Sequence, residues 1–108
     1  MGAMSYADKE LTEQKSHLSR TERMKKALEE QLAPVAMTLT DDSTRHAGHA
    51  GAAPGGETHY SLKVVSRAFE GLGRVARQRL VYQALGEEFE TGLHALAMDL
   101  KTPAEAGV

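Results

Sequence analysis

The sequence predicts one α/β (α+β) domain of αββαβ order, with a three-stranded mixed sheet that carries helices on one face. Two segments show apolar residues at helical spacing and three show the alternation of strands, in the order helix, strand, strand, helix, strand. The chain has 108 residues, which is the size of a single domain. The last strand–helix–strand step is a βαβ unit, so its two strands should run parallel with a right-handed crossover.

The first predicted helix begins after Ser19. Ser19 and Glu22 have the spacing of a capping box, in which each side chain bonds the backbone N–H of the other residue. One apolar stripe follows, made of Met24, Leu28 and Leu32. Pro34 should end the helix. Residues 1–18 lack apolar periodicity and are predicted to be a flexible tail, in which residues 1–4 resemble a cloning remnant. The domain is therefore expected at residues 19–103, with a short tail at 104–108.

Two strands are expected next, at residues 35–40 and 60–66. Both alternate between apolar and polar positions, which is typical of half-buried strands. The connection at residues 41–57 is rich in Gly, Ala and His. Loops longer than about 12–15 residues without structure are usually functional or disordered.

A second helix is predicted at residues 74–85, with Gly73 as its N-cap and Gly86 just after its end. Its apolar surface is broad, which favours cover on more than one side. The acidic residues 87–92 could form one helical turn. The third strand, at residues 94–100, places His94, Leu96, Met98 and Leu100 on one face.

Composition excludes several function classes. The chain has no cysteine, so disulfides, thiolate catalysis and a self-contained iron–sulfur cluster are excluded. Its net charge is −2. Nucleic-acid-binding domains are usually strongly basic, and an acidic chain is not attracted to anionic membranes. No apolar run approaches the ~18 residues that span a bilayer, and no Ser–His–acid order, P-loop or GxGxxG motif is present. We expect a non-enzymatic, cytoplasmic protein that does not bind membranes.

Histidine is the residue type that could carry chemistry. His59 and His94 open the two parallel strands, and the long loop, which holds His46 and His49, reaches the same end of the sheet. One loop histidine, His59 and His94 can therefore converge, and imidazole is a good ligand for iron, zinc or copper. A structural zinc site made from all four is the alternative. His59 precedes a core-facing tyrosine, which favours a hydrogen-bonding or interface role for it. His17, in the tail, is given no role.

Five short motifs in order resemble the BolA family over about residues 20–103. They are Glu57–Tyr60 (ETHY), Val65–Ser66, Phe69–Gly71 (FEG), Arg77–Tyr82 (RQRLVY) and Leu93–Ala97 (LHALA). The resemblance implies a compact αββαβ domain similar to a type II KH domain. Two positions depart from the family pattern: Gln78 stands where His is usual, and no Trp follows Thr102 and Pro103.

The resemblance also implies a function in iron–sulfur cluster assembly and iron homeostasis. Its partner would be a monothiol glutaredoxin of the CGFS type with glutathione, and the two proteins would share a [2Fe–2S] cluster that the isolated chain does not hold. His94 and one loop histidine would ligate one iron, while the partner and glutathione supply the sulfur ligands. Counting forward from Ser43 favours His46, and counting back from His59 favours His49 slightly more. A eukaryotic member would be organellar.

A DNA-binding transcriptional regulator is the alternative function. Its candidate contacts are Lys63, Arg74, Arg77 and Arg79, the last three on the second helix of the KH-like fold. KH domains clamp the nucleic-acid backbone with a GXXG loop, which residues 71–73 imitate only in part. The competing interpretation is that Arg77 and Arg79 pair with the acidic run of Glu87, Glu88 and Glu90.

Overall fold

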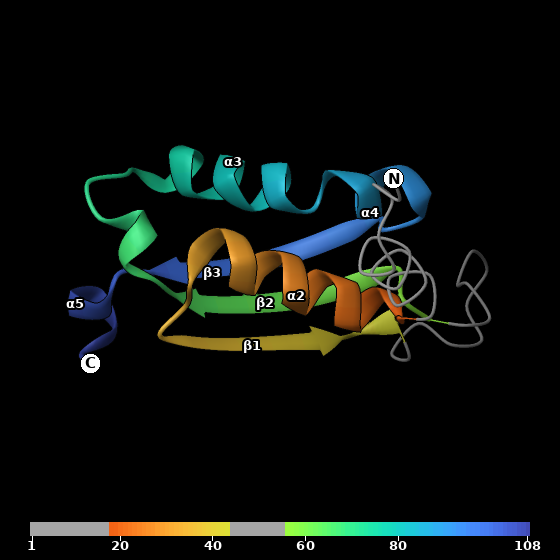
Figure 1. Cartoon of the computed structure of the whole chain (residues 1–108), viewed down its shortest axis with the longest axis horizontal. Coiled ribbons are helices and arrows are strands. Elements are labelled where there is room, and N and C mark those ends of the chain that lie inside the picture. The colour runs from red at the N-terminus through yellow and green to blue at the C-terminus, as the bar shows by residue number, and fades with distance from the viewer. Residues whose placement is uncertain (1–17, 44–55) are drawn as a thin grey trace, which may run out of the picture.

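The computed structural model describes residues 18–43 and 56–108. Its long elements follow the predicted αββαβ order (Figure 1). The elements are α2 (Arg20–Leu32), β1 (Ala36–Asp41), β2 (His59–Val65), the 3-10 turn η2 (Arg67–Phe69), α3 (Arg74–Ala84), α4 (Gly86–Thr91), β3 (Ala95–Lys101) and α5 (Pro103–Ala106). Most of the predicted N-terminal tail, at 1–17, and most of the long loop, at 44–55, lie outside the described residues. No helix within the described ranges is long and apolar enough to cross a membrane.

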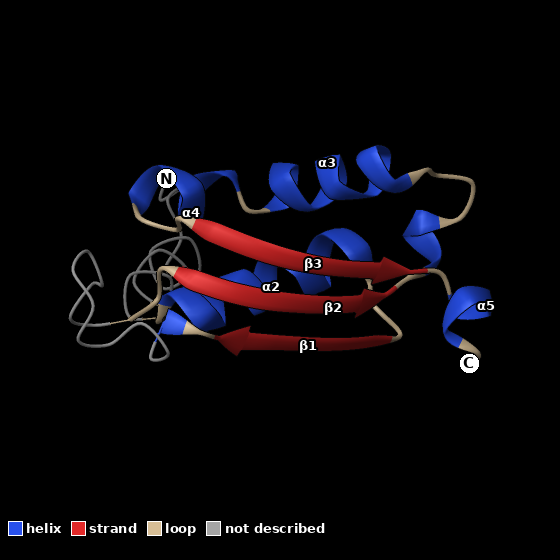
Figure 2. Cartoon of the chain, turned by 180° about the vertical axis from the view of Figure 1, so that it is seen from behind, coloured by secondary structure: helices blue, strands red, loops and turns tan. Residues whose placement is uncertain are grey.

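The sheet has the order β1-β2-β3, with β2 in the centre. Strands β1 and β2 are antiparallel, with Ala36 opposite Val65, and β2 and β3 are parallel, with His59 opposite Ala95. The predicted mixed sheet is therefore confirmed. Helices α2 and α3 lie on one face, and the view from behind shows the other face uncovered (Figure 2).

The core lies between the sheet and helices α2 and α3. The predicted stripe of α2 is buried, as are the alternate residues of β2 that face it; the buried members are Met24, Leu28, Leu32, Tyr60, Leu62 and Val64. Phe69 of η2, Val81 of α3, Leu85 and Leu93 complete this cluster. Each such side chain contributes roughly 1.5–3 kcal/mol when it is fully buried. This packing fixes the register of β2, because a shift by one residue would turn Tyr60 out to solvent.

The predicted capping box of α2 is confirmed. The backbone N–H of Glu22 donates to the Ser19 hydroxyl at 3.1 Å, and the backbone N–H of Ser19 donates to Oε1 of Glu22 at 3.1 Å. The helix ends where Ala33 adopts a left-handed conformation, one residue before Pro34. Local sequence signals thus define both ends of α2.

Three local expectations were wrong. Helix α3 is covered on one side only: Val75 is 63% exposed and Tyr82 is 46% exposed, because the sheet supplies a single layer. The second helix does end at Leu85, its C-cap, but Gly86 is not a left-handed cap after it, because the chain enters α4 directly at Gly86. Residues 103–106, mostly assigned to a tail, form α5, because Thr102 and Glu105 make a second capping box.

Candidate functional site

Two histidines meet at one end of the sheet, where the parallel strands β2 and β3 both begin. His59 opens β2, and His94 immediately precedes β3 and donates its backbone N–H to the carbonyl of Thr58 at 2.8 Å. The imidazole ring centres lie 6.1 Å apart, with the ring planes at 75°. His94 is exposed and His59 is half-buried. We call the group formed by Ser43, Thr58, His59 and His94 the histidine rim.

Hydroxyl groups hold the base of the histidine rim. The Ser43 hydroxyl accepts from the backbone N–H of Thr58 at 2.8 Å and from that of His59 at 3.0 Å. The Thr58 hydroxyl lies 3.2 Å from that of Ser43 and 2.9 Å from Nδ1 of His59. A hydrogen bond to one ring nitrogen sets the orientation of an imidazole, as in metal sites where a second group bonds each histidine ligand. Ser43 and Thr58 were not predicted as site residues, because a serine and a threonine in a loop carry no distinctive sequence signal.

Asp41 closes the base of the long loop. Its carboxylate accepts from the backbone N–H of Ser43 at 2.9 Å and from that of Glu57 at 3.0 Å. Burial by itself would raise the pKa of Asp41, but the hydrogen bonds from Ser43 and Glu57 outweigh it, and the pKa is lowered. Ser43 and Glu57 flank the stretch that contains His46 and His49, so that stretch leaves and rejoins the fold at the histidine rim. His46 and His49 themselves lie outside the described residues, as does His17.

The histidine rim has the donor chemistry for half of a metal centre. An imidazole nitrogen binds a metal ion at about 2.1 Å, so two rings at this separation can share one ion after a small rotation of their side chains. Within residues 18–43 and 56–108, no group of three or more His, Asp or Glu side chains is arranged to hold a metal. The described part of the rim therefore offers two nitrogen ligands, and further ligands must come from the 44–55 stretch or from another molecule.

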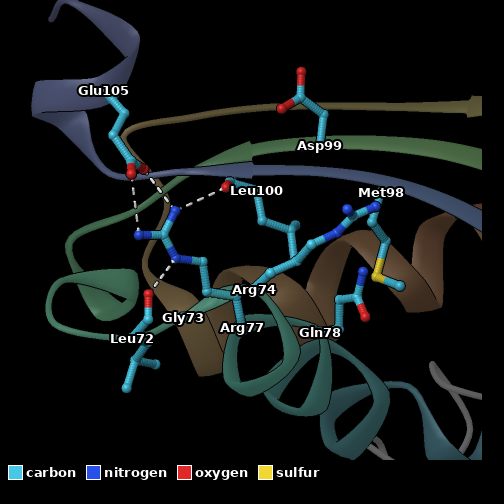
Figure 3. A pocket seen from close by; sticks show the side chains of 9 residues that line it. All are labelled: Leu72, Gly73, Arg74, Arg77, Gln78, Met98, Asp99, Leu100 and Glu105. Carbon is cyan, nitrogen blue, oxygen red and sulfur yellow. Dashed lines mark hydrogen bonds and ion pairs between the residues drawn. The ribbon is translucent and has the colours of Figure 1, made fainter.

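The four candidate nucleic-acid contacts do not share one surface. Lys63 lies on the uncovered face of the sheet, opposite the face that carries α3. Arg77 is held inside the fold, where it donates to the carbonyls of Leu72 and Leu100 at 2.9 and 3.0 Å and to the carboxylate of Glu105 at 2.6 Å. Arg74 lines a cavity of about 580 Å³ beside Arg77, together with Gln78 and Asp99 (Figure 3). Arg79 is exposed.

The expected pairing of α3 with the acidic run was wrong for Arg77 and Glu88. Glu88 accepts instead from Arg20 at 2.8 Å and from Arg23 at 2.9 Å, both in α2. The reason is topological: Glu88 in α4 bonds the start of α2, whereas Arg77 bonds Glu105 in α5. Figure 1 shows α4 and α5 at opposite ends of the sheet.

Comparison with known proteins gives consistent matches. The family model described as "BolA: BolA-like protein" matches residues 28–105. "Protein BOLA1, chloroplastic" from Arabidopsis thaliana is 44% identical over 106 residues, covering 96% of this chain and 66% of that protein. "SufE-like protein 1, chloroplastic/mitochondrial" from the same plant is 47% identical over 91 residues, covering 81% of this chain and 24% of that protein. The solved structure of BolA1 from A. thaliana superposes with a TM-score of 0.73 at 48% identity, covering 82% of this chain and 96% of that one. The chain thus spans slightly less than two thirds of the first relative and about a quarter of the second.

Proposed function

Because the chain belongs to the BolA-like protein family, we propose that it is a non-enzymatic adaptor that binds a monothiol glutaredoxin and co-ligates a [2Fe–2S] cluster. The observation that carries this proposal is the histidine pair, with ring centres 6.1 Å apart at an exposed end of the sheet. The cluster would be shared with a CGFS-type partner and glutathione, in iron–sulfur cluster assembly and iron homeostasis.

The ligands that this chain offers fit a cluster shared with a partner and do not fit a cluster held by this chain alone. The chain contains no cysteine, so the sulfur ligands must come from the partner and from glutathione. In Rieske centres, two imidazoles bind one iron and two thiolates bind the other. This arrangement raises the reduction potential of the cluster. His94 is the first ligand, since it is exposed at the rim.

The second ligand is His46, His49 or His59. The loop histidines follow from the resemblance, whereas the structure supports His59 by its position beside His94. The hydrogen bond between Thr58 and Nδ1 of His59 would orient that ring as a ligand. If a loop histidine is the ligand, His59 has the hydrogen-bonding or interface role that the sequence favours.

A place in iron–sulfur metabolism is supported by the match to a SufE-like protein. The two plant relatives carry the labels chloroplastic and chloroplastic/mitochondrial. These labels favour an organellar compartment if this chain comes from a eukaryote.

Reconstitution tests the proposal. The chain is mixed with a CGFS-type glutaredoxin, glutathione, iron and sulfide, and the visible absorption and circular dichroism spectra are recorded. We expect a heterodimer spectrum distinct from that of the glutaredoxin homodimer. His94→Ala should abolish it, whereas the control His17→Ala should not change it. An unchanged spectrum with His94→Ala would exclude His94 as a ligand.

Single alanine variants of the other histidines then identify the second ligand. Exactly one of His46→Ala, His49→Ala and His59→Ala should change the spectrum as strongly as His94→Ala. A set in which all three leave the spectrum unchanged would contradict two-histidine ligation by this chain.

A further inference from the structure

Arg20, the first residue of α2, bonds the segment that leads to His94. Its side chain is only 11% exposed. Nη1 donates to the Glu88 carbonyl at 3.0 Å, to Oε1 of Glu88 at 2.8 Å and to the Thr91 hydroxyl at 3.0 Å. Nη2 donates to the Thr91 carbonyl at 3.0 Å. Arg20 therefore fixes the end of α4, three residues before His94.

The same residue also bonds the segment that leads to His59. The backbone N–H of Arg20 donates to Oε1 of Glu57 at 2.8 Å, and Glu57 lies two residues before His59. Glu57 is held from its other side by Asp41, which accepts its backbone N–H. Arg20 thus contacts both polypeptide segments that carry the paired histidines.

The path of the chain between Thr91 and His94 is fitted to the guanidinium of Arg20. Gly92 has a φ of +136°, and a Cβ at this position would lie 2.9 Å from Nη2 of Arg20. Only glycine combines that conformation with so close an approach. Leu93 is buried and donates its backbone N–H to the Glu88 carbonyl at 2.8 Å, after which His94 donates to Thr58. The position of His94 follows from these consecutive contacts.

The terminal nitrogens determine where the Arg20 side chain lies. Nε of Arg20 is buried and finds no hydrogen-bond partner in the described part of the chain. Leaving a buried donor unpaired is costly, so the contacts of Nη1 and Nη2 must compensate for it. A guanidinium presents its donors in a rigid planar fork, whereas a lysine ammonium would offer a single point of contact.

We propose that Arg20 is a positioning residue for the histidine rim: it holds the segments of His59 and His94 at the separation that metal ligation requires. This inference deepens the function proposed above and rests on it. Arg20 acts through the contact of its backbone N–H with Glu57 and through the contacts of its side chain with Thr91, next to Gly92. Removal of the fork should let the end of α4 move relative to the start of β2.

Arg23 provides a matched control. It shares the carboxylate of Glu88, with Nε donating at 2.9 Å and Nη2 at 3.0 Å. Arg23 also donates from Nη1 to the carbonyl of Leu18 at 2.7 Å, just before the start of α2. Loss of the charge and of two hydrogen bonds to Glu88 is therefore common to the Arg20→Gln and Arg23→Gln variants, whereas contact with Thr91 is lost only in the first.

The test compares these two variants in the free full-length chain by NMR. We expect wild type and Arg23→Gln to show a nuclear Overhauser effect between the rings of His59 and His94, and Arg20→Gln to lose it. With glutaredoxin, glutathione, iron and sulfide, Arg20→Gln should bind the shared cluster at least about tenfold more weakly, the scale of lost supporting contacts in metal sites. Arg20→Lys should lie between Arg20→Gln and wild type. Similar ring contacts and spectra for Arg20→Gln and Arg23→Gln would overturn the proposal.

Two further outcomes remain decisive. If Arg20→Gln fails to fold, Arg20→Lys, which keeps the charge beside Glu88, decides the question by the same ring contact and by its cluster spectrum. If wild type itself forms no heterodimer with the glutaredoxin, the proposed function fails, while the ring contact in the free chain still reports whether Arg20 positions the histidines.

Discussion

At each end of the sheet a largely buried arginine bonds backbone carbonyls and one carboxylate, but the two carboxylates differ in exposure to solvent. At the histidine rim, Arg20 bonds two backbone carbonyls and the carboxylate of Glu88. At the opposite end, Arg77 bonds the carbonyls of Leu72 and Leu100 and the carboxylate of Glu105. Each arginine joins a helix to a segment that is distant in sequence. The side chain of Glu88 is 9% exposed, however, and that of Glu105 is 48% exposed.

Because of this difference, we expect the two arginine–carboxylate networks to contribute unequally to stability and to have different roles. An exposed ion pair contributes little, because water and salt screen it, whereas removal of one partner of a buried pair leaves an uncompensated charge. The end with the buried network is also the end that carries the histidines. A rigid support fits ligands that must keep a defined separation. At the other end, the Arg77–Glu105 pair, in which only the carboxylate is exposed, attaches a four-residue helix.

Glu88→Ala should have the largest effect on stability. The substitution leaves the guanidinium of Arg20 buried without its carboxylate and removes the shared contact of Arg23. We expect the free energy of unfolding to fall by about 3 kcal/mol, measured by urea denaturation. Glu105→Ala is the control and should lower it much less. Equal losses for the two variants would show that burial does not distinguish the two ends.

Two buried serines provide a second comparison of the ends. Ser43 at the rim accepts from two backbone N–H groups, those of Thr58 and His59. Ser66, after β2, accepts from the N–H of Ala68 and donates to the Leu32 carbonyl at 2.6 Å. Because each alanine variant leaves buried backbone groups unpaired, both should lose about 2 kcal/mol of stability, measured by thermal or urea unfolding.

Histidine resonances separate the roles of these serines. Ser43→Ala should shift the ring signals of His59, since it removes the acceptor of that residue's own N–H, while Ser66→Ala should leave them in place. If both variants moved the His59 signals alike, the rim would not be a separate structural unit.

Local signals predicted the parts of the fold that depend on neighbours in sequence. The capping box of Ser19 and Glu22, the end of α2 before Pro34, and the alternation along β1 and β2 all act over a few residues. The topology then placed the starts of β2 and β3 together, and with them His59 and His94. A strand–helix–strand connection generally makes its two strands parallel, so this placement could be predicted without a structure.

The contacts that support the histidine rim could not be predicted in the same way. Arg20 and Glu88 are 68 positions apart in the sequence, and Arg77 and Glu105 are 28 apart. Each arginine had nearer carboxylates, and only the packing of α4 and α5 determines which one it bonds. The burial of α3 was overestimated because it also depends on packing between distant segments. Tyr82 packs beside Phe89 of α4, with ring centres 5.1 Å apart, and its side chain still remains partly exposed.

The smallest expected effect is a pH response confined to the exposed end. The hydrogen bond from Arg77, aided by the N–H of Thr102, lowers the pKa of Glu105 from 4.5 to about 2. Because the folded pKa lies below the unfolded one, the stabilisation is complete above about pH 4.5 and is lost as the pH falls towards 2. The amide signals of Thr102 and Glu105, followed by NMR, should therefore move across this window as α5 detaches.

Glu105→Gln should remove this response at Thr102. Asp41, at the rim, also has a lowered pKa, so the amides of Ser43 and Glu57 should report their own acid transition in both wild type and Glu105→Gln. Since the two carboxylates lie at opposite ends of the sheet and share no partner, their transitions should be independent. A Thr102 amide that still titrates in Glu105→Gln, or rim amides that lose their transition with it, would show that the two ends are coupled through the sheet.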